Sequence, residues 1–267
     1  MTDRYPQRIV CLTEEPTEVL YRIGEQDRIV GISGFTVRPP QARREKPKVS
    51  AFTSARIDKI MALKPDLVIG FSDIQADIAR DLIRAGVEVW ISNHRSVEGI
   101  LNYTLRLGAL VGAVGRAQAL VDEMQVAIDA ARRQAATLAR RPLVYFEEWD
   151  EPPMTAIQWV CELIRIAGGD DLFPERAECS LGRDRILADA DEVIRRAPDV
   201  IIGSWCGKKF RPDKVAARPG WDNIPAIRNG RVAEIKSAVI LQPGPAAILE
   251  GLPQLARLVA GAVKGER

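Results

Sequence analysis

Short runs of aliphatic residues alternate with amphipathic stretches along the first 111 residues. The runs are rich in Val and Ile and predict four strands, at 9–12, 29–33, 66–71 and 87–91. Apolar residues at helical spacing predict helices between and after them, at 16–23, 57–63, 73–85 and 96–111. Because these strands are apolar on both faces and separated by helices, the pattern predicts a parallel sheet with helices on both sides.

A longer helical stripe follows. Ala117, Leu120, Met124 and the apolar residues after them keep helical spacing, which predicts one helix from about Arg116 to Arg140. At 1.5 Å per residue it would be roughly 37 Å long, which suits a strut lying across two lobes. A coiled-coil seam is the alternative, but the stripe is rich in Ala and only about three heptads long.

The second half of the chain shows the same alternation of predicted strands and helices as the first. Strands are predicted at 143–146, 199–203 and 230–235, and helices at 159–167, 189–196 and 245–263. One stretch of the first half recurs in the second at an offset of 133 positions. Its residues Pro65 and Gly70 correspond to Pro198 and Gly203. The same offset relates the pair Glu14-Glu15 to the pair Glu147-Glu148.

Two halves built alike predict an α/β protein of two lobes, each with a mainly parallel sheet and flanking helices. The expected boundaries are an N-terminal lobe at 1–114, a connecting backbone helix at 115–141 and a C-terminal lobe at 142–267. Small-molecule sites favour the junction of such lobes, so we expect a cleft where the strand ends meet.

Composition narrows the function. The 267 residues carry 38 basic and 36 acidic side chains, which gives a net charge of +2 without a basic block that would indicate nucleic-acid binding. Since no apolar run approaches the ~18 residues of a membrane span, we expect a protein that is not embedded in a membrane. The first residues show no signal-peptide pattern, so we expect a cytoplasmic monomer, or a periplasmic one if a leader was trimmed.

Signatures of catalysis are missing from the sequence. It contains no P-loop, no G-x-G-x-x-G after a strand, no nucleophile elbow and no H-E-x-x-H, and His94 is its single histidine. We therefore expect no catalytic residues, no metal site and no intrinsic cofactor. The enzymatic alternative is a cytosolic cofactor-handling enzyme that uses paired cleft carboxylates as acid and base.

Several segments together resemble a known family. They are T-E-E-P-T-E at 13–18, L-K-P-D-L-V-I at 63–69, E-W-D-E-P-P at 148–153, W-C-G at 205–207 and P-G-W-D-N-I-P-A-I-R-N-G-R-V at 219–232. The order resembles the helical-backbone (class III) substrate-binding proteins of ABC importers for vitamin B12, iron-siderophores and haem, and is most similar to the cobalamin-binding branch. The resemblance covers about residues 7–263 and implies a shallow, rigid cleft between two lobes.

The resemblance also implies ligand contacts from loops at strand C-termini. By position the ligand-binding residues of the N-terminal lobe are Thr13, Glu14, Glu15, Phe35, Phe52, Phe71 and Ser72. Those of the C-terminal lobe are Glu148, Trp149, Trp205, Cys206 and Gln242. The same resemblance implies docking on an ABC transporter permease through one acidic residue per lobe, here Asp58 and Asp191, where relatives carry Glu.

The residue types favour a particular ligand chemistry. Aromatic rings at strand ends suit a flat, largely apolar ligand, and the acids there suit donors or positive charge. A corrinoid such as cobalamin fits both. The alternatives are another metal chelate or a flat or cationic metabolite. His94 is a candidate cobalt ligand or a solvent-facing residue, and Cys206 is a soft ligand, a reactive thiol or a buried residue.

Overall fold

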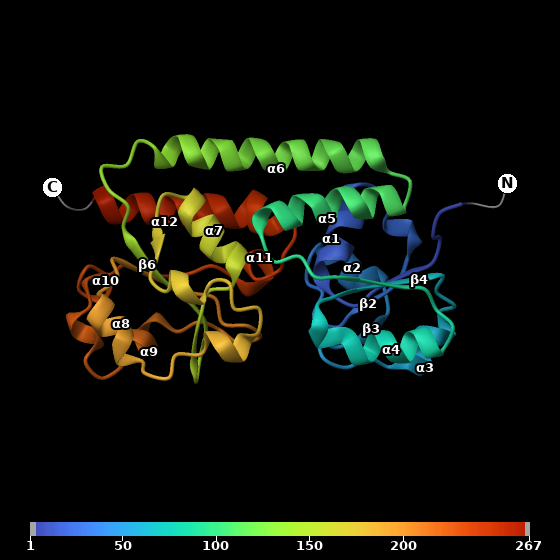
Figure 1. Cartoon of the computed structure of the whole chain (residues 1–267), viewed down its shortest axis with the longest axis horizontal. Helices are drawn as coiled ribbons and strands as arrows, with labels where there is room; N and C mark the ends of the chain where they lie inside the picture. Colours follow the sequence, from blue (N-terminus) through green and yellow to red (C-terminus); the bar gives the residue numbers. More distant parts are fainter. Residues whose placement is uncertain (1–3, 265–267) are drawn as a thin grey trace. The chain divides into compact units, whose positions relative to one another are not determined.

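The computed structural model describes residues 4–264 and divides into two compact units. Within the described residues, unit 1 comprises the chain up to His94 together with Glu98–Glu123, and unit 2 comprises Arg95–Val97 and the chain from Met124 onward. The division falls inside helix α6 (Val114–Ala135), which runs unbroken from one unit into the other (Figure 1).

Unit 1 is built on a sheet of five parallel strands in the order β3-β2-β1-β4-β5. The strands are β1 (Ile9–Cys11), β2 (Ile29–Ser33), β3 (Lys48–Ser50), β4 (Leu67–Phe71) and β5 (Val89–Ser92). The helices are α1 (Glu14–Arg22), α2 (Pro40–Glu45), α3 (Ile57–Ala62), α4 (Ala76–Arg84) and α5 (Val97–Leu110). The predicted parallel sheet is confirmed, while β3 and α2 lie between the predicted strand at 29–33 and the predicted helix at 57–63, where no element was expected.

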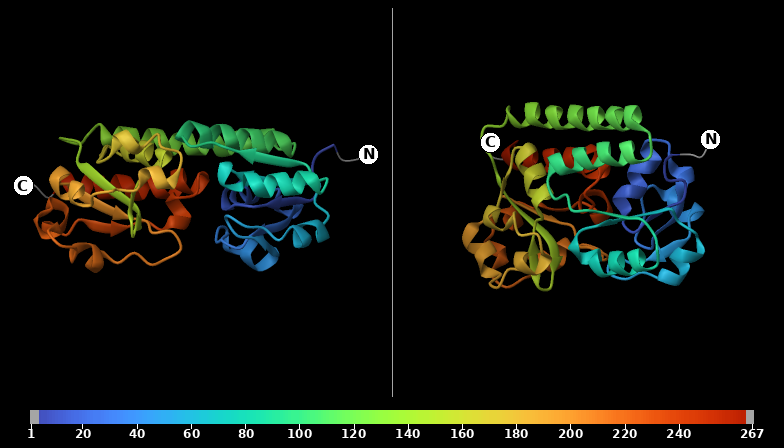
Figure 2. Two further views of the ribbon diagram at one scale, coloured as in Figure 1. Left: turned by 60° about the horizontal axis from the view of Figure 1, so that its bottom comes forward. Right: turned by 45° about the vertical axis from the view of Figure 1, so that its right-hand side comes forward.

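Helices cover both faces of this sheet, as Figure 2 shows. On one face Val10 and Val68 of the central strands pack with Ile60 of α3 and Leu82 of α4 in one buried cluster. Central parallel strands need such cover because neither of their faces is polar. The arrangement places all five strand C-termini, and therefore the loops that follow them, along one edge of the sheet.

Unit 2 has a mixed sheet in the order β10-β9-β6-β7, with β8 also paired to β6. The strands are β6 (Leu143–Asp150), β7 (Pro153–Thr155), β8 (Asp170–Asp171), β9 (Val200–Gly203) and β10 (Val232–Glu234). Only β7 runs antiparallel, folding back on the outer half of β6. The short strands β7 and β8 are absent from the predicted pattern because two or three residues carry no periodicity.

The helices of unit 2 are α7 (Gln158–Ile166), α8 (Asp191–Arg196), α9 (Pro212–Ala216), α10 (Pro225–Arg228), α11 (Ser237–Ile240) and α12 (Leu252–Lys264). A single π turn at Ala247–Gly251 precedes α12, within the stretch expected to be one regular helix. The three helices α9 to α11 have five residues or fewer, which is too short for a helical apolar stripe to reveal them.

Helix α6 ends at Ala135, five residues before the predicted end. Beyond it the chain is held by ion pairs within unit 2, since Arg140 contacts Asp199 at 2.7 Å and Arg141 contacts Asp170 at 2.7 Å. These side chains direct the segment into β6, so the apolar spacing that continues to Leu138 belongs to a turn and not to helix.

The offset of 133 positions relates structurally similar glycines in the two units, but it does not relate structurally equivalent acidic residues. Gly70 is the residue before the last of β4 and Gly203 is the last residue of β9, and each of these strands pairs with the first strand of its unit. Glu147, however, pairs with Gly203, whereas the backbone of Leu12 bonds to Ile69 beside Gly70. The acidic pairs are therefore two residues out of step, so that Glu14 begins a helix while Glu147 lies within strand β6.

Gly203 has a steric role that makes a clear prediction. A Cβ at this position would lie 1.8 Å from Cε2 of the buried Phe210 ring. We expect Gly203→Ala to lower the free energy of unfolding by about 1–3 kcal/mol or more, because the ring cannot retreat within the packed core. Gly115→Ala, in helix α6 with no atom within 4 Å of the new methyl group, is the matched control and should be neutral or slightly stabilising. Equal urea midpoints for the two variants would contradict the prediction.

Candidate functional site at the strand ends

The start of α1, at the strand-end edge of unit 1, contains a buried pair of carboxyls, Glu14 and Glu15. Thr13 precedes α1, and its hydroxyl donates to Oε1 of Glu15 at 2.6 Å. Burial, with the neighbouring Glu15 charge second, raises the pKa of Glu14 to about 8. Burial likewise raises the pKa of Glu15 to about 7. At neutral pH this edge therefore carries much less negative charge than its sequence suggests.

A buried glutamine ties three of these loops together. Gln75 accepts from the backbone N–H of Phe71 at 2.9 Å and donates to the backbone oxygens of Phe52 at 2.9 Å and Leu12 at 3.4 Å. It thereby fixes the ends of β1 and β4 against the loop after β3. Sequence reasoning missed Gln75, and the only signal is its place four residues after the end of a strand.

The aromatic residues of unit 1 differ widely in exposure. Phe35 is 55% exposed, Phe52 is half-buried, and Phe71 is only 5% exposed. Ser72 is buried with a φ of +59°, and its hydroxyl accepts from the Ile74 N–H, so Ser72 caps the turn that follows. Of the predicted ligand residues in this unit, Phe35 and Phe52 therefore have accessible side-chain surface, whereas the others are buried.

In unit 2 the strand-end acids are paired with cations. Glu147 is fully buried and accepts from both guanidinium nitrogens of Arg218, at 2.6 and 2.9 Å. It also accepts from the Tyr145 hydroxyl at 2.9 Å and from Nε1 of Trp205 at 3.0 Å. Four hydrogen bonds leave this carboxylate saturated, so it is a structural anchor for the loop after β9.

The neighbouring acids follow the same rule. Glu148 accepts from the buried Arg185 at 2.5 Å, and Arg185 also donates to the Thr155 carbonyl at 2.7 Å. Asp150 is paired with Lys208 and, at 3.2 Å, with Lys214, which together hold the pKa of Asp150 below its usual value despite its burial. The cationic partners of these acids come from segments 37 to 71 residues away in sequence.

Trp149 and Trp205 have different roles. Trp149 is half-buried, its Nε1 donates to the Glu151 carbonyl at 2.9 Å, and the Lys208 ammonium lies 4.2 Å from its ring centre. Trp205 is 3% exposed and packs edge-on against Phe210 in the core of unit 2. The Trp205 ring therefore packs beneath the loop that follows β9, and its role in ligand binding stays a prediction.

The remaining predicted residues lie as follows. Cys206 is exposed and Gln242 is half-buried, both in loops of unit 2. Asp58 is exposed at the start of α3 and pairs with Arg56 at 2.9 Å, and Asp191 is exposed at the start of α8. Both positions are accessible, and their role in docking stays a prediction.

His94 belongs to a group of stacked rings in unit 1. Its ring stacks on Tyr103 with 4.3 Å between centres, and its Nδ1 lies 2.7 Å from the Ser92 hydroxyl. Within residues 4–264 no group of three or more His, Cys, Asp or Glu side chains is placed to hold a metal ion. Across the same residues no helix combines the length and apolar character needed to cross a bilayer.

Two α/β units with ring-bearing and polar strand-end loops, linked through one long helix, define a binding protein of the class predicted from the sequence. Residues 9–239 match the family described as periplasmic binding protein, and the chain belongs to that family. It is accordingly a non-catalytic protein that binds a small molecule for ABC-type uptake.

The similar proteins are named for binding different ligands. The chain is 26% identical to the vitamin B12-binding protein of Vibrio parahaemolyticus over 92% of this chain and 86% of that protein. Its fold matches the vitamin B12-binding protein BtuF of Vibrio cholerae, with a TM-score of 0.79 at 20% identity over 98% and 99% of the two chains. It also matches the haem-binding protein RhuT of Roseiflexus sp. RS-1 in apo form, with a TM-score of 0.81 at 23% identity over 96% and 99%.

Proposed function

We propose that this protein binds cobalamin or a closely related corrinoid and delivers it to an ABC importer. The observation that carries the proposal is the 26% identity, over nearly the whole chain, with a protein named for vitamin B12 binding. The strand-end loops supply chemistry that suits a corrinoid, because their accessible residues include aromatic rings and an amide. These residues are Phe35, Phe52, Trp149 and Gln242.

Charge at the strand ends is compatible with this ligand. Cobalamin presents many neutral amides, a flat ring system and one phosphodiester. The acids of unit 2 are paired with Arg218, Arg185 and Lys208, and the pKa values of Glu14 and Glu15 are raised to about 8 and about 7. We infer that the loops recognise the ligand through rings and neutral donors and acceptors, with little net charge.

The test is a calorimetric titration with cyanocobalamin and dicyanocobinamide. We expect saturable binding at micromolar protein, and we expect Phe35→Ala and Trp149→Ala each to raise the Kd roughly 10- to 100-fold, since a buried ring contributes about 1.5–3 kcal/mol. Val126→Ala, at a 67% exposed position on α6, is the control and should leave the Kd unchanged. Absence of saturable binding of either corrinoid by the wild-type protein would reject the ligand assignment.

Haem is the second candidate, favoured by the neutralised acids. Free carboxylates at the strand ends would repel haem propionates, but here the strand-end acids Glu147, Glu148 and Asp150 already have cationic partners, and Lys208 lies over Trp149. Titration with haemin under the same conditions separates the two, because tighter binding of haemin than of cyanocobalamin would replace the first proposal by the second.

A further inference from the structure

A donor-lined cavity of about 340 Å³ lies in unit 1, beside the strand-end loops already described. It is lined by the segment that follows β5 and by one face of α5, with the residues Ser92, Asn93, His94, Gly99, Asn102, Tyr103 and Arg106. A single water needs only ~15 Å³ of such space, so the cavity can admit a small molecule or a substituent of a larger one.

Two residues that line the cavity, His94 and Tyr103, belong to a stack of three rings. Trp90 stacks on Tyr103 with 5.3 Å between centres, and Tyr103 stacks on His94 with 4.3 Å, both at an angle of 17°. Phe71 meets His94 edge-on at 5.3 Å, which connects the stack to the strand-end loop after β4. The Tyr103 hydroxyl is buried without a hydrogen-bond partner in the described part of the chain, and this burial, with the Glu15 charge second, raises the pKa of Tyr103 well above its usual value.

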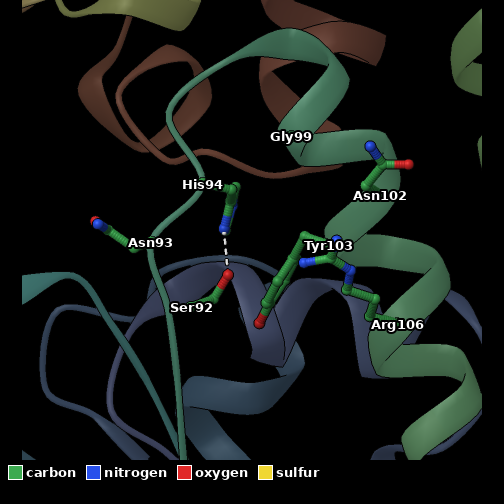
Figure 3. A pocket seen from close by; sticks show the side chains of 7 residues that line it. All are labelled: Ser92, Asn93, His94, Gly99, Asn102, Tyr103 and Arg106. Carbon is green, nitrogen blue, oxygen red and sulfur yellow. Dashed lines mark hydrogen bonds between the residues drawn. The ribbon is translucent and has the colours of Figure 1, made fainter.

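Several side chains that line the cavity carry hydrogen-bond donors without a protein partner among the described residues. Among residues 4–264 the Arg106 guanidinium has neither an ion-pair nor a hydrogen-bond partner, and the side-chain amides of Asn93 and Asn102 have none either. Figure 3 shows Arg106 and Asn102 rising from α5 while the Ser92–His94 segment passes opposite them. No carboxylate lines the cavity, so its only formal charge is the positive charge of Arg106.

We propose that this cavity is a subsite for an oxyanion, a carboxylate or phosphate group. A guanidinium offers paired N–H donors in the geometry that such groups accept, and neighbouring amides can satisfy further oxygens. The ring stack fixes two of the lining residues, His94 and Tyr103, so the donors would meet the anion with little reorganisation. The oxyanion has two possible sources, a free small anion or the anionic substituent of the transported ligand, and the second source rests on the proposed function.

His94 provides a direct probe because it is the only histidine of the chain. Its imidazole proton signal in an NMR spectrum therefore reports on this cavity alone. We expect sodium phosphate, titrated to about 50 mM at constant pH and ionic strength, to shift that signal saturably with a Kd in the millimolar range or below. Arg106→Gln should weaken the response at least tenfold, and Arg106→Lys should retain part of it. Arg133→Gln, an exposed position on α6, should leave it unchanged.

The second arm uses the ligand itself. Cobalamin carries a phosphodiester that cobinamide lacks, so an anionic substituent in the cavity predicts that Arg106→Gln weakens cobalamin binding at least tenfold while cobinamide binding is unaffected. Either a phosphate response lost in Arg106→Gln or this selective loss of cobalamin supports the subsite. If phosphate leaves the His94 signal unmoved and Arg106→Gln alters neither corrinoid selectively, the proposal is overturned. Should the wild-type protein bind no corrinoid, the phosphate titration alone decides.

Discussion

Replacing Arg218 by methionine is expected to lower the free energy of unfolding of unit 2 by about 3–5 kcal/mol. The variant removes two charge-assisted hydrogen bonds from Glu147, a carboxylate with no exposed side-chain surface. Tyr145 and Trp205 still donate to it, but two neutral donors do not compensate a buried charge. The cost therefore comes mainly from the carboxylate that is left behind and only partly from the lost pair.

Urea unfolding followed by tryptophan fluorescence measures this change. Four of the five tryptophans, Trp149, Trp159, Trp205 and Trp221, lie in unit 2 and report on it. Arg211→Met, which breaks an exposed pair with Asp213, is the matched control and should cost at most about 1 kcal/mol. The double variant Glu147→Gln, Arg218→Met should recover part of the loss, because it removes the charge as well as its partner. Equal losses for Arg218→Met and Arg211→Met would show that Glu147 is not an anchor.

The parts of the fold that the sequence predicts are those with local signals. Val68 and Ile69 lie in a Val/Ile run that predicts β4, and Gly86 follows α4 where a helix ends with positive φ. Gly70 and Gly203 are also visible in the sequence, because each follows a Val/Ile run. The reason that glycine is required there is the packing of side chains from other segments. A side chain at Gly70 would meet Gln75, and one at Gly203 would meet Phe210.

The candidate site was harder to predict because its partners are distant in sequence. The acids at 147–150 are visible as a run, but Arg185 and Arg218 are separated from them by 37 and 71 positions, and nothing in their local sequence marks them as partners. The sequence therefore reveals the acidic residues at the strand ends of unit 2, but it does not reveal that cationic partners neutralise their charge. The solvent exposure of the aromatic side chains could not be predicted from the sequence either. Trp149 and Trp205 both lie near strand ends, but only Trp149 reaches the surface.

The raised pKa values in unit 1 predict that part of the stability of this unit decreases as the pH rises. A carboxyl whose pKa is near 4.5 when unfolded and about 8 when folded binds more protons in the folded state between these values. Stability then falls with increasing pH across this window, by at most about 1.4 kcal/mol per pH unit for one group. Below about pH 4.5 the group is neutral in both states and contributes no pH dependence.

Glu14→Gln should remove this dependence, since the amide keeps the shape of the neutral carboxyl and cannot ionise. We expect the variant to match the wild-type protein at pH 5 and to exceed its stability by about 2–4 kcal/mol at pH 8, with the coupling to Glu15 keeping the gain below the single-group limit. Differential scanning calorimetry at both pH values measures the effect, and Glu98→Gln, at an exposed position on α5, is the control. An identical difference between Glu14→Gln and wild type at pH 5 and pH 8 would mean that Glu14 ionises normally in the folded protein, and that the strand-end edge of unit 1 is negatively charged after all.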